Sequence, residues 1–140
     1  MFKTAMIAIV ALLAAVLVAT PSPVSAASAA KADGIRLLAK LAGNTAATGK
    51  ADYREFKNNL GQTVRRINVE VQHAPPGAIW GVRHNGVKIG QMTINGLGVG
   101  KFSRQTATDD PNKQGAVPTM KAGDKIVVGP GTVSGILQNN

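Results

Sequence analysis

Residues 63–104 read TVRRINVEVQHAPPGAIWGVRHNGVKIGQMTINGLGVGKFSR, and this stretch decides the fold. Apolar and polar residues alternate along it, as they do in a strand with one buried face and one solvated face. Two Asn-Gly pairs interrupt the alternation, Asn85-Gly86 and Asn95-Gly96. Asn-Gly is a strong hairpin signal because both central residues of a type I′ turn need a positive φ. We therefore predict an antiparallel meander with a two-residue hairpin at each pair.

The pattern of the first hairpin also predicts an irregularity. Residues that flank a two-residue turn are direct partners on one face, so His84 should lie opposite Val87, which brings both Val87 and Ile89 inward. Met92 has the opposite parity from Ile89 and would then point outward. One extra residue at Gly90-Gln91 restores the register, so we predict a β-bulge there.

Further strands flank the meander on both sides. Residues 34–41 and 50–56 alternate before it, and residues 126–128 and 132–137 follow it after a long polar loop, 105–118. A helix over 34–41 is the alternative, but eight residues are short for a helix and strands follow. The sequence thus predicts an all-β fold, a single antiparallel β-sandwich of seven or eight strands; a small barrel is the second possibility.

The beginning of the sequence has the pattern of a secretory signal peptide. A positive start at Lys3 precedes an apolar run of sixteen residues, 5–20, and a small-residue site at Val24-Ser25-Ala26. A transmembrane helix would need about 20 apolar residues. We predict cleavage after Ala26, with Ala29 as a second possibility. The predicted organisation is a signal peptide over 1–26, a disordered spacer over 27–33 and the β-sandwich domain over 34–138, in a secreted or periplasmic protein without a transmembrane segment in its mature form.

The amino-acid composition limits the range of possible functions. The 140 residues suit one domain, and the net charge is +9. Without Lys3 of the signal peptide, fifteen basic side chains face seven acidic ones, a net charge of +8. Such a charge attracts polyanions, although it also keeps a small domain soluble. The absence of cysteine excludes thiol nucleophiles, iron–sulfur clusters and cysteine-based zinc sites, and leaves stability to packing alone.

The basic residues are the main functional candidates. Six of them have the parity of outward-facing positions in the predicted strands, with the first two placed on an edge strand: Arg36, Lys40, Arg54, Arg66, Lys88 and Lys101. We predict a weak polyanion-binding set from these six. Outward cations also keep sheet edges from pairing with other chains, and that role remains the alternative. Sequence-specific nucleic-acid binding is not expected, because few aromatic residues accompany the charges.

No cofactor and no catalytic residue is predicted. Trp80, His84 and Met92 could form a small-ligand or metal site, but zinc and copper want three or four ligands, and His84 suits a structural role with a satisfied ring nitrogen. The acidic loop at residues 109–112 offers oxygen atoms to calcium, but Pro111 interrupts it and the EF-hand spacing is absent. No serine has a Gly-x-Ser-x-Gly setting, so the protein is not expected to be an enzyme.

Five segments together resemble a small β-sandwich module of exported bacterial proteins: residues 49–53, 68–71, 74–77, 82–90 and 117–124. The resemblance implies a fold and no enzymatic activity. A fainter likeness is to the chordin-type sandwich domain, related in shape to copper–zinc superoxide dismutase. The His-x-His ligands and the cysteines of that group are absent here, so neither metal binding nor dismutase activity is implied.

These observations lead to two functional hypotheses. The first is an exported, non-enzymatic β-sandwich that acts as a structural or adhesive module at the cell envelope or in a matrix, with its basic face against anionic polymers. The alternative is a periplasmic small-ligand or metal-binding domain that uses the region of Trp80, His84 and Met92.

Overall fold

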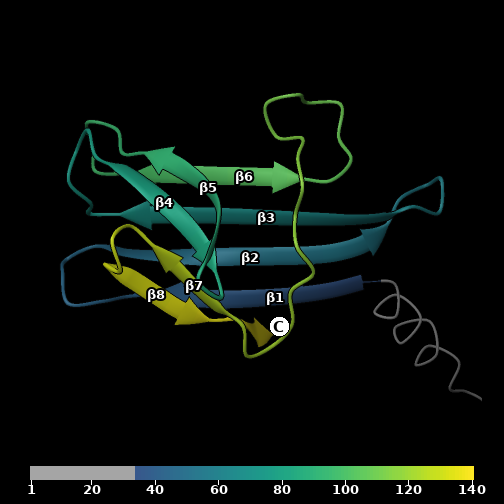
Figure 1. The fold of residues 1–140 in the computed structure, drawn as a ribbon, viewed down its shortest axis with the longest axis horizontal. Helices are drawn as coiled ribbons and strands as arrows, with labels where there is room; N and C mark the ends of the chain where they lie inside the picture. The colour runs from purple at the N-terminus through teal and green to yellow at the C-terminus, as the bar shows by residue number, and fades with distance from the viewer. Residues whose placement is uncertain (1–33) are drawn as a thin grey trace, which may run out of the picture. The chain divides into compact units, whose positions relative to one another are not determined.

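The computed structural model describes residues 34–140. The predicted signal peptide and spacer lie outside the described residues. Two antiparallel sheets pack face to face, and this part of the chain contains strands without any helix, so the predicted all-β sandwich is confirmed. Figure 1 shows the smaller sheet crossing the larger one at an angle.

Residues 34–140 form nine strands, where the sequence predicted seven or eight. The five-stranded sheet has the order β6-β3-β2-β1-β9, and the four-stranded sheet has the order β5-β4-β7-β8. The additional strand, β9, has two residues and extends the larger sheet beside β1. The bounds are β1 Gly34–Leu41, β2 Thr48–Lys57, β3 Thr63–Gln72, β4 Ile79–His84, β5 Val87–Thr93, β6 Gly100–Gln105, β7 Lys125–Val128, β8 Val133–Ile136 and β9 Gln138–Asn139.

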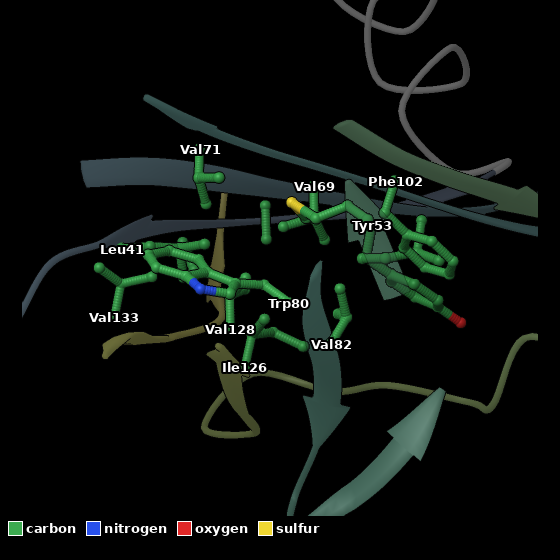
Figure 2. Packing of buried hydrophobic residues seen from close by; sticks show 14 of the residues in the cluster. Leu41, Tyr53, Val69, Val71, Trp80, Val82, Phe102, Ile126, Val128 and Val133 are labelled. Atoms are coloured by element: carbon green, nitrogen blue, oxygen red, sulfur yellow. The ribbon is translucent and has the colours of Figure 1, made fainter. Parts of the chain in front are cut away.

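Alternation places the core between the two sheets. Ile67, Val69 and Val71 of β3 point inward and are buried, while the residues between them face outward. Inward side chains of β4, including Trp80 and Val82, meet them from the smaller sheet (Figure 2). Such burial is the main stabilising contribution in a domain that has no disulfide.

One buried polar side chain lies at the end of this core. Tyr53 is fully buried, and its hydroxyl donates to Glu55 Oε2 at 3.0 Å. Arg65 Nε donates to the same oxygen at 3.0 Å. Burial is the main cause that raises the pKa of Tyr53, to about 12, so the hydroxyl keeps its proton at neutral pH.

The first predicted hairpin is confirmed, but the second hairpin is wrong, and so is the predicted meander, because β3 and β6 pair in one sheet while β4 and β5 pair in the other. Asn85 and Gly86 have φ values of 48° and 88°, and His84 pairs with Val87, as a two-residue turn requires. At the second site the positive φ belongs to Gly98, and the Asn95 amide donates to the carbonyl of Val99, which makes a three-residue loop. The physical reason is the Asn95 side chain, whose oxygen accepts from two amides of the loop and holds it open. The chain then leaves the smaller sheet and enters the larger one.

The predicted bulge exists, one residue earlier than expected. Val82 pairs with Gly90 and Arg83 pairs with Lys88, so Ile89 is the extra residue. The predicted inward position of Val87 is wrong, because Val87 is 66% exposed at a hairpin tip that extends beyond the core. Ile89 is half-buried and packs against the core, as expected.

Close packing fastens both sides of the sandwich. Between β5 and β6, the Phe102 ring covers Gly90, where an added Cβ would lie 2.2 Å from a ring carbon. Arg104 spans the same gap, donating from Nη1 to the Ile89 carbonyl at 2.6 Å. On the other side, Gly135 of β8 lies so close to β1 that an added Cβ would be 2.1 Å from the carbonyl oxygen of Lys40. These contacts hold the two sheets against each other at both edges of the sandwich.

Candidate functional site

The outer face of the five-stranded sheet gathers most of the predicted basic residues. Along much of β1, β2 and β3, every second residue is buried in the core, so the residues that alternate with these face outward. We call this surface the basic face. Its residues are Arg36, Leu38 and Lys40 of β1, Lys50, Asp52 and Arg54 of β2, Arg66, Asn68 and Glu70 of β3, Lys101, Ser103 and Gln105 of β6, and Gln138 of β9.

Strand register arranges these side chains in three rows that run across the strands. An arginine row consists of Arg36, Arg54 and Arg66, which are direct partners on β1, β2 and β3. A lysine row consists of Lys40, Lys50, Glu70 and Lys101. Equivalent positions of the two rows are four residues apart along a strand, about 13 Å. Between them lies a middle row of Gln138, Leu38, Asp52, Asn68 and Ser103.

The face carries a surplus of positive charge. Its six basic side chains outnumber two acidic ones, Asp52 and Glu70. Asp52 accepts from Arg36 Nη2 at 2.9 Å and lies 3.4 Å from Arg54 Nε. Burial alone would raise the pKa of Asp52, but hydrogen bonds from the two arginines outweigh it and hold the pKa below its usual range. Asp52 is therefore charged at neutral pH and fixes two arginine side chains of the row.

Direct pairing of like charges costs stability, and this face contains several such pairs. Like charges opposite each other on neighbouring strands destabilise a sheet by some tenths of a kcal/mol up to about 1 kcal/mol. Arg66 pairs with Arg54 on one side and with Gln105 on the other, so no acidic residue compensates it within its row. Among the described residues, Arg66 Nε is buried without a hydrogen-bond partner. An anion bound at the arginine row would offset both costs.

The basic face is hollowed along its middle. A hollow of about 910 Å³ lies over β1, β2 and β9, with Leu38, Asp52 and Gln138 among its lining residues. A second hollow of about 310 Å³ lies over β2, β3 and β6 and includes Asn68 and Ser103. Lys50 and Asp52 line both hollows. The middle row thus lies along the floor of a groove, with the lysine row lining one side and Arg36 lining the other side at the β1 end.

The structure brings five of the six predicted polyanion-binding residues together: Arg36, Lys40, Arg54, Arg66 and Lys101. Lys88 lies on β5, in the other sheet. The prediction that Arg36 and Lys40 lie on an edge strand is wrong, because β1 runs between β2 and β9. Sequence reasoning missed Lys50, although it has the same parity as Arg54 and could have been included.

Residues of the alternative site do not share a cavity. Trp80 and Met92 are cross-strand partners buried in the core, whereas His84 lies at the far end of β4. His84 Nε2 is 2.8 Å from Asp124 Oδ2, as the predicted structural role with a satisfied ring nitrogen requires. Residues 34–140 contain no group of three or more His, Cys, Asp or Glu side chains placed to hold a metal ion.

Sequence analysis did not anticipate the partner of His84. Asp124 is buried, and it also accepts from the Lys121 amide at 3.0 Å. The hydrogen bond with His84 is the largest cause that holds the pKa of Asp124 below its usual range, against the effect of burial. The pair ties the 84–87 hairpin to the turn that precedes β7. Forty residues separate the partners, so no local signal could have indicated the contact.

The acidic segment 109–112 belongs to the longer loop 105–118, where the side chain of Asp110 interacts with other groups of the same loop. Asp110 accepts from the Asn112 amide at 3.0 Å and pairs with Lys113 Nζ at 3.5 Å. These contacts engage both carboxylate oxygens of Asp110 within the loop. They are typical of a solvated loop, the role that the interrupting Pro111 favoured in the sequence.

No protein-family model matches the chain, and a search of the curated proteins finds no match. The resemblance to exported bacterial sandwich modules therefore stays a prediction. Within residues 34–140, no helix has the length and apolar character to cross a membrane.

Proposed function

We propose that the protein is an exported, non-enzymatic module that binds anionic polymers of the cell envelope or of an extracellular matrix through its basic face. The observation that carries the proposal is the arrangement of cations in paired rows along a groove. Scattered surface lysines suffice for solubility, but like charges aligned on neighbouring strands cost stability and need a reason. A polymer with repeated negative charges supplies that reason, because it contacts several cations at once.

The affinity should fall with salt concentration, and the slope of that fall should indicate how many anionic groups the protein neutralises. Each anionic group that the face neutralises releases counterions, so affinity falls steeply as the salt concentration rises. Among the described strands of the larger sheet, Phe56 is the one aromatic residue with the outward parity of Arg54, and it lies beyond the arginine row, opposite Gly34 and Val64. A single half-buried aromatic side chain does not supply the series of stacking platforms that a nucleic-acid strand needs. The partner is therefore a polyanion that is recognised by its charge and hydrogen-bonding groups.

The decisive test compares two triple variants with equal net charge. Lys40, Lys50 and Arg66 form no ion pair with a described residue, so changing them to Gln leaves no acidic group without a partner. Arg83, Lys88 and Lys125 likewise form none, and they lie on the outer side of the smaller sheet. Changing these three to Gln gives the matched control.

Retention on heparin and on immobilised lipopolysaccharide is then measured against a salt gradient. The variant of the basic face should elute at much lower salt, with the slope of log affinity against log salt reduced by about 2. The control should elute close to the wild type. Equal losses in both variants, or a wild type that is not retained at low salt, would contradict the proposal.

Export is tested separately. The protein, expressed with its complete leader, should appear outside the cytoplasm with Ala27 as its first residue, because Val24-Ser25-Ala26 has the small-residue pattern of a cleavage site. Mass spectrometry of the amino-terminal peptide measures this directly. An uncleaved protein retained in the cytoplasm would contradict the export half of the proposal and leave the binding half open to its own test.

A further inference from the structure

The groove on the basic face has the shape of a track for a linear chain. The middle row lies along its floor, the lysine row lines one side of both hollows, and Arg36 lines the opposite side of the first. The two hollows meet at Lys50 and Asp52, so together they extend from β9 to β6. Five strands span four spacings, about 19 Å. A ligand that fills the groove must therefore be extended and must lie across the strands.

The floor offers hydrogen bonds in addition to charge. Ser103 donates to Asn68 Oδ1 at 2.6 Å, and within the described part of the chain the NH₂ group of Asn68 donates to no other residue. Gln138 and Asn139 add amide groups at the β9 end, where Leu38 and Ile136 add an apolar surface. Neutral hydroxyl groups and apolar C–H faces together characterise a sugar ring. A polyphosphate chain has neither.

The acidic residue on the floor is part of an ion-pair cluster. Asp52 accepts from Arg36 Nη2 at 2.9 Å and lies 3.4 Å from Arg54 Nε, so these two guanidinium groups compensate its charge. A ligand hydroxyl group can still donate to this carboxylate, because an ionised carboxylate has about four acceptor positions. A polyphosphate chain has no hydroxyl group along its length to make that bond.

We propose that the ligand is a linear acidic polysaccharide that lies along the middle row, with its carboxylate or sulfate groups directed to the arginine and lysine rows on either side. This inference rests on the proposed function and specifies the class of polymer. Extended polysaccharides with two-fold symmetry turn alternate acidic groups to opposite sides, which matches cations on both sides of a neutral track. One sugar unit advances roughly one strand spacing, so the groove accommodates about four units.

The test compares three linear ligands of equal charge number: an oligomer of β-1,4-linked mannuronate, a sulfated heparin oligosaccharide and a polyphosphate. Fluorescence anisotropy of labelled ligands gives the affinities with the full exported protein. We expect one or both sugar ligands to bind about tenfold more tightly than polyphosphate, since only they use the floor. Whether carboxylate or sulfate is preferred identifies the source. Affinity for the preferred sugar should rise from dimer to tetramer and then level off.

Two variants locate the effect. The double variant Asn68→Ala/Ser103→Ala keeps all charges and should lose about tenfold in sugar affinity while polyphosphate binding stays unchanged. Its control is Gln91→Ala/Thr93→Ala on the outer side of the smaller sheet, where both residues are exposed and neither ligand should be affected. Asp52→Asn acts in the opposite direction for polyphosphate, whose affinity should rise because the change adds one positive charge and releases Arg36 and Arg54 from their ion pairs.

The outcomes separate the two proposals. Equal or tighter binding of polyphosphate, or equal losses of both ligand types in the floor variant, would overturn the polysaccharide inference and leave polyanion binding intact. Absence of binding to every ligand at low salt, or binding that ignores the change of Lys40, Lys50 and Arg66, would overturn the proposed function itself. Thermal unfolding curves of each variant establish that a loss of binding is not a loss of fold.

Discussion

The two outer faces of the sandwich are both basic, and they differ in arrangement. On the smaller sheet, Arg83, Lys88 and Lys125 face outward without any acidic residue among the described outward positions. Only Arg83 and Lys88 are direct partners. The Lys88 side chain lies over Gly81, and a small hollow of about 350 Å³ beside it is lined in part by the exposed Ile79. On the larger sheet, cations form rows along a continuous groove.

This difference separates total charge from the arrangement of charge, and the proposed function depends on the arrangement. Both faces attract polyanions from a distance, since the long-range field depends on the summed charge. Only the larger sheet presents cations at a fixed spacing on both sides of a hydrogen-bonding floor. Strand register produces that spacing, and the following experiments change either the register, its supports or the charges.

The largest loss of stability should come from Gly135→Ala. This change should also displace one end of the groove and so remove the difference between the two faces. The added Cβ would meet the backbone carbonyl of Lys40 at 2.1 Å, so β8 and β9 must move away from β1. We expect the free energy of unfolding to fall by about 3 kcal/mol. Urea unfolding followed by the fluorescence of the single tryptophan, Trp80, measures the loss. Gly96→Ala is the control, because nothing lies within 4 Å of its added Cβ, and it should be neutral within about 0.5 kcal/mol.

A smaller loss is expected from Asp124→Asn, which loosens the smaller sheet and leaves the basic face in place. The change weakens the hydrogen bonds to His84 and to the Lys121 amide. Hydrogen bonds to a charged group contribute about 2 kcal/mol, so the free energy of unfolding should fall by about that amount. Asp110→Asn, on the exposed loop, should cost far less. Heparin retention should be unchanged in both variants. That result would show that the stability of the smaller sheet does not affect heparin binding by the larger one.

The dependence of stability on acidic pH should show a third, smaller difference between the two sheets. Asp124 and Asp52 both have pKa values in the folded protein below the ordinary value. Their stabilising contribution is complete above the unfolded pKa, about 3.9, and is lost as the pH falls through the lower folded values. The free energy of unfolding should therefore decline below about pH 4. Asp124→Asn should flatten that decline more than Asp52→Asn does, because Asp124 is the more buried of the two; equal slopes in all three proteins would contradict this assignment.

The smallest change is expected from moving charge between the faces. In the variant that lacks Lys40, Lys50 and Arg66, three new lysines at Ile79, Gln91 and Thr93 restore the net charge on the smaller sheet. All three positions are exposed. Heparin affinity should stay within about twofold of the unrestored variant, because the added cations do not flank a groove. Full recovery would show that net charge is sufficient and would remove the distinction between the faces.

Much of the fold was predictable because alternation is a local signal. The strand around Ile67 and the turn at Asn85-Gly86 follow from residues within a few positions of one another. The prediction of the second turn was wrong because the second Asn-Gly pair occurs in a longer loop. In that loop Asn95 accepts side-chain hydrogen bonds and Gly98 takes the left-handed conformation. Dipeptide identity does not determine which glycine adopts a positive φ.

The candidate site was predictable only in part. Parity indicates that a residue points outward, but it does not indicate which sheet the strand joins, and this is why Lys88 was grouped with Arg66. The groove depends on the register between β1, β2 and β3, together with the return of β9 to the larger sheet. The hydrophobic pattern indicates which face a residue takes, but the register also depends on the geometry of the connecting turns and, for β9, on a partner strand about one hundred residues away.

The pairing of Leu38 with Gln138 joins segments that lie about one hundred residues apart in the chain. Contacts of such long sequence separation form late, because a large loop must close before they contribute. The β9 end of the groove, near Gln138, cannot be completed while the chain is still being synthesised toward Gln138. The export that we propose would require the chain to cross a membrane unfolded, and this delay would then keep the polypeptide translocation-competent until it reaches its destination.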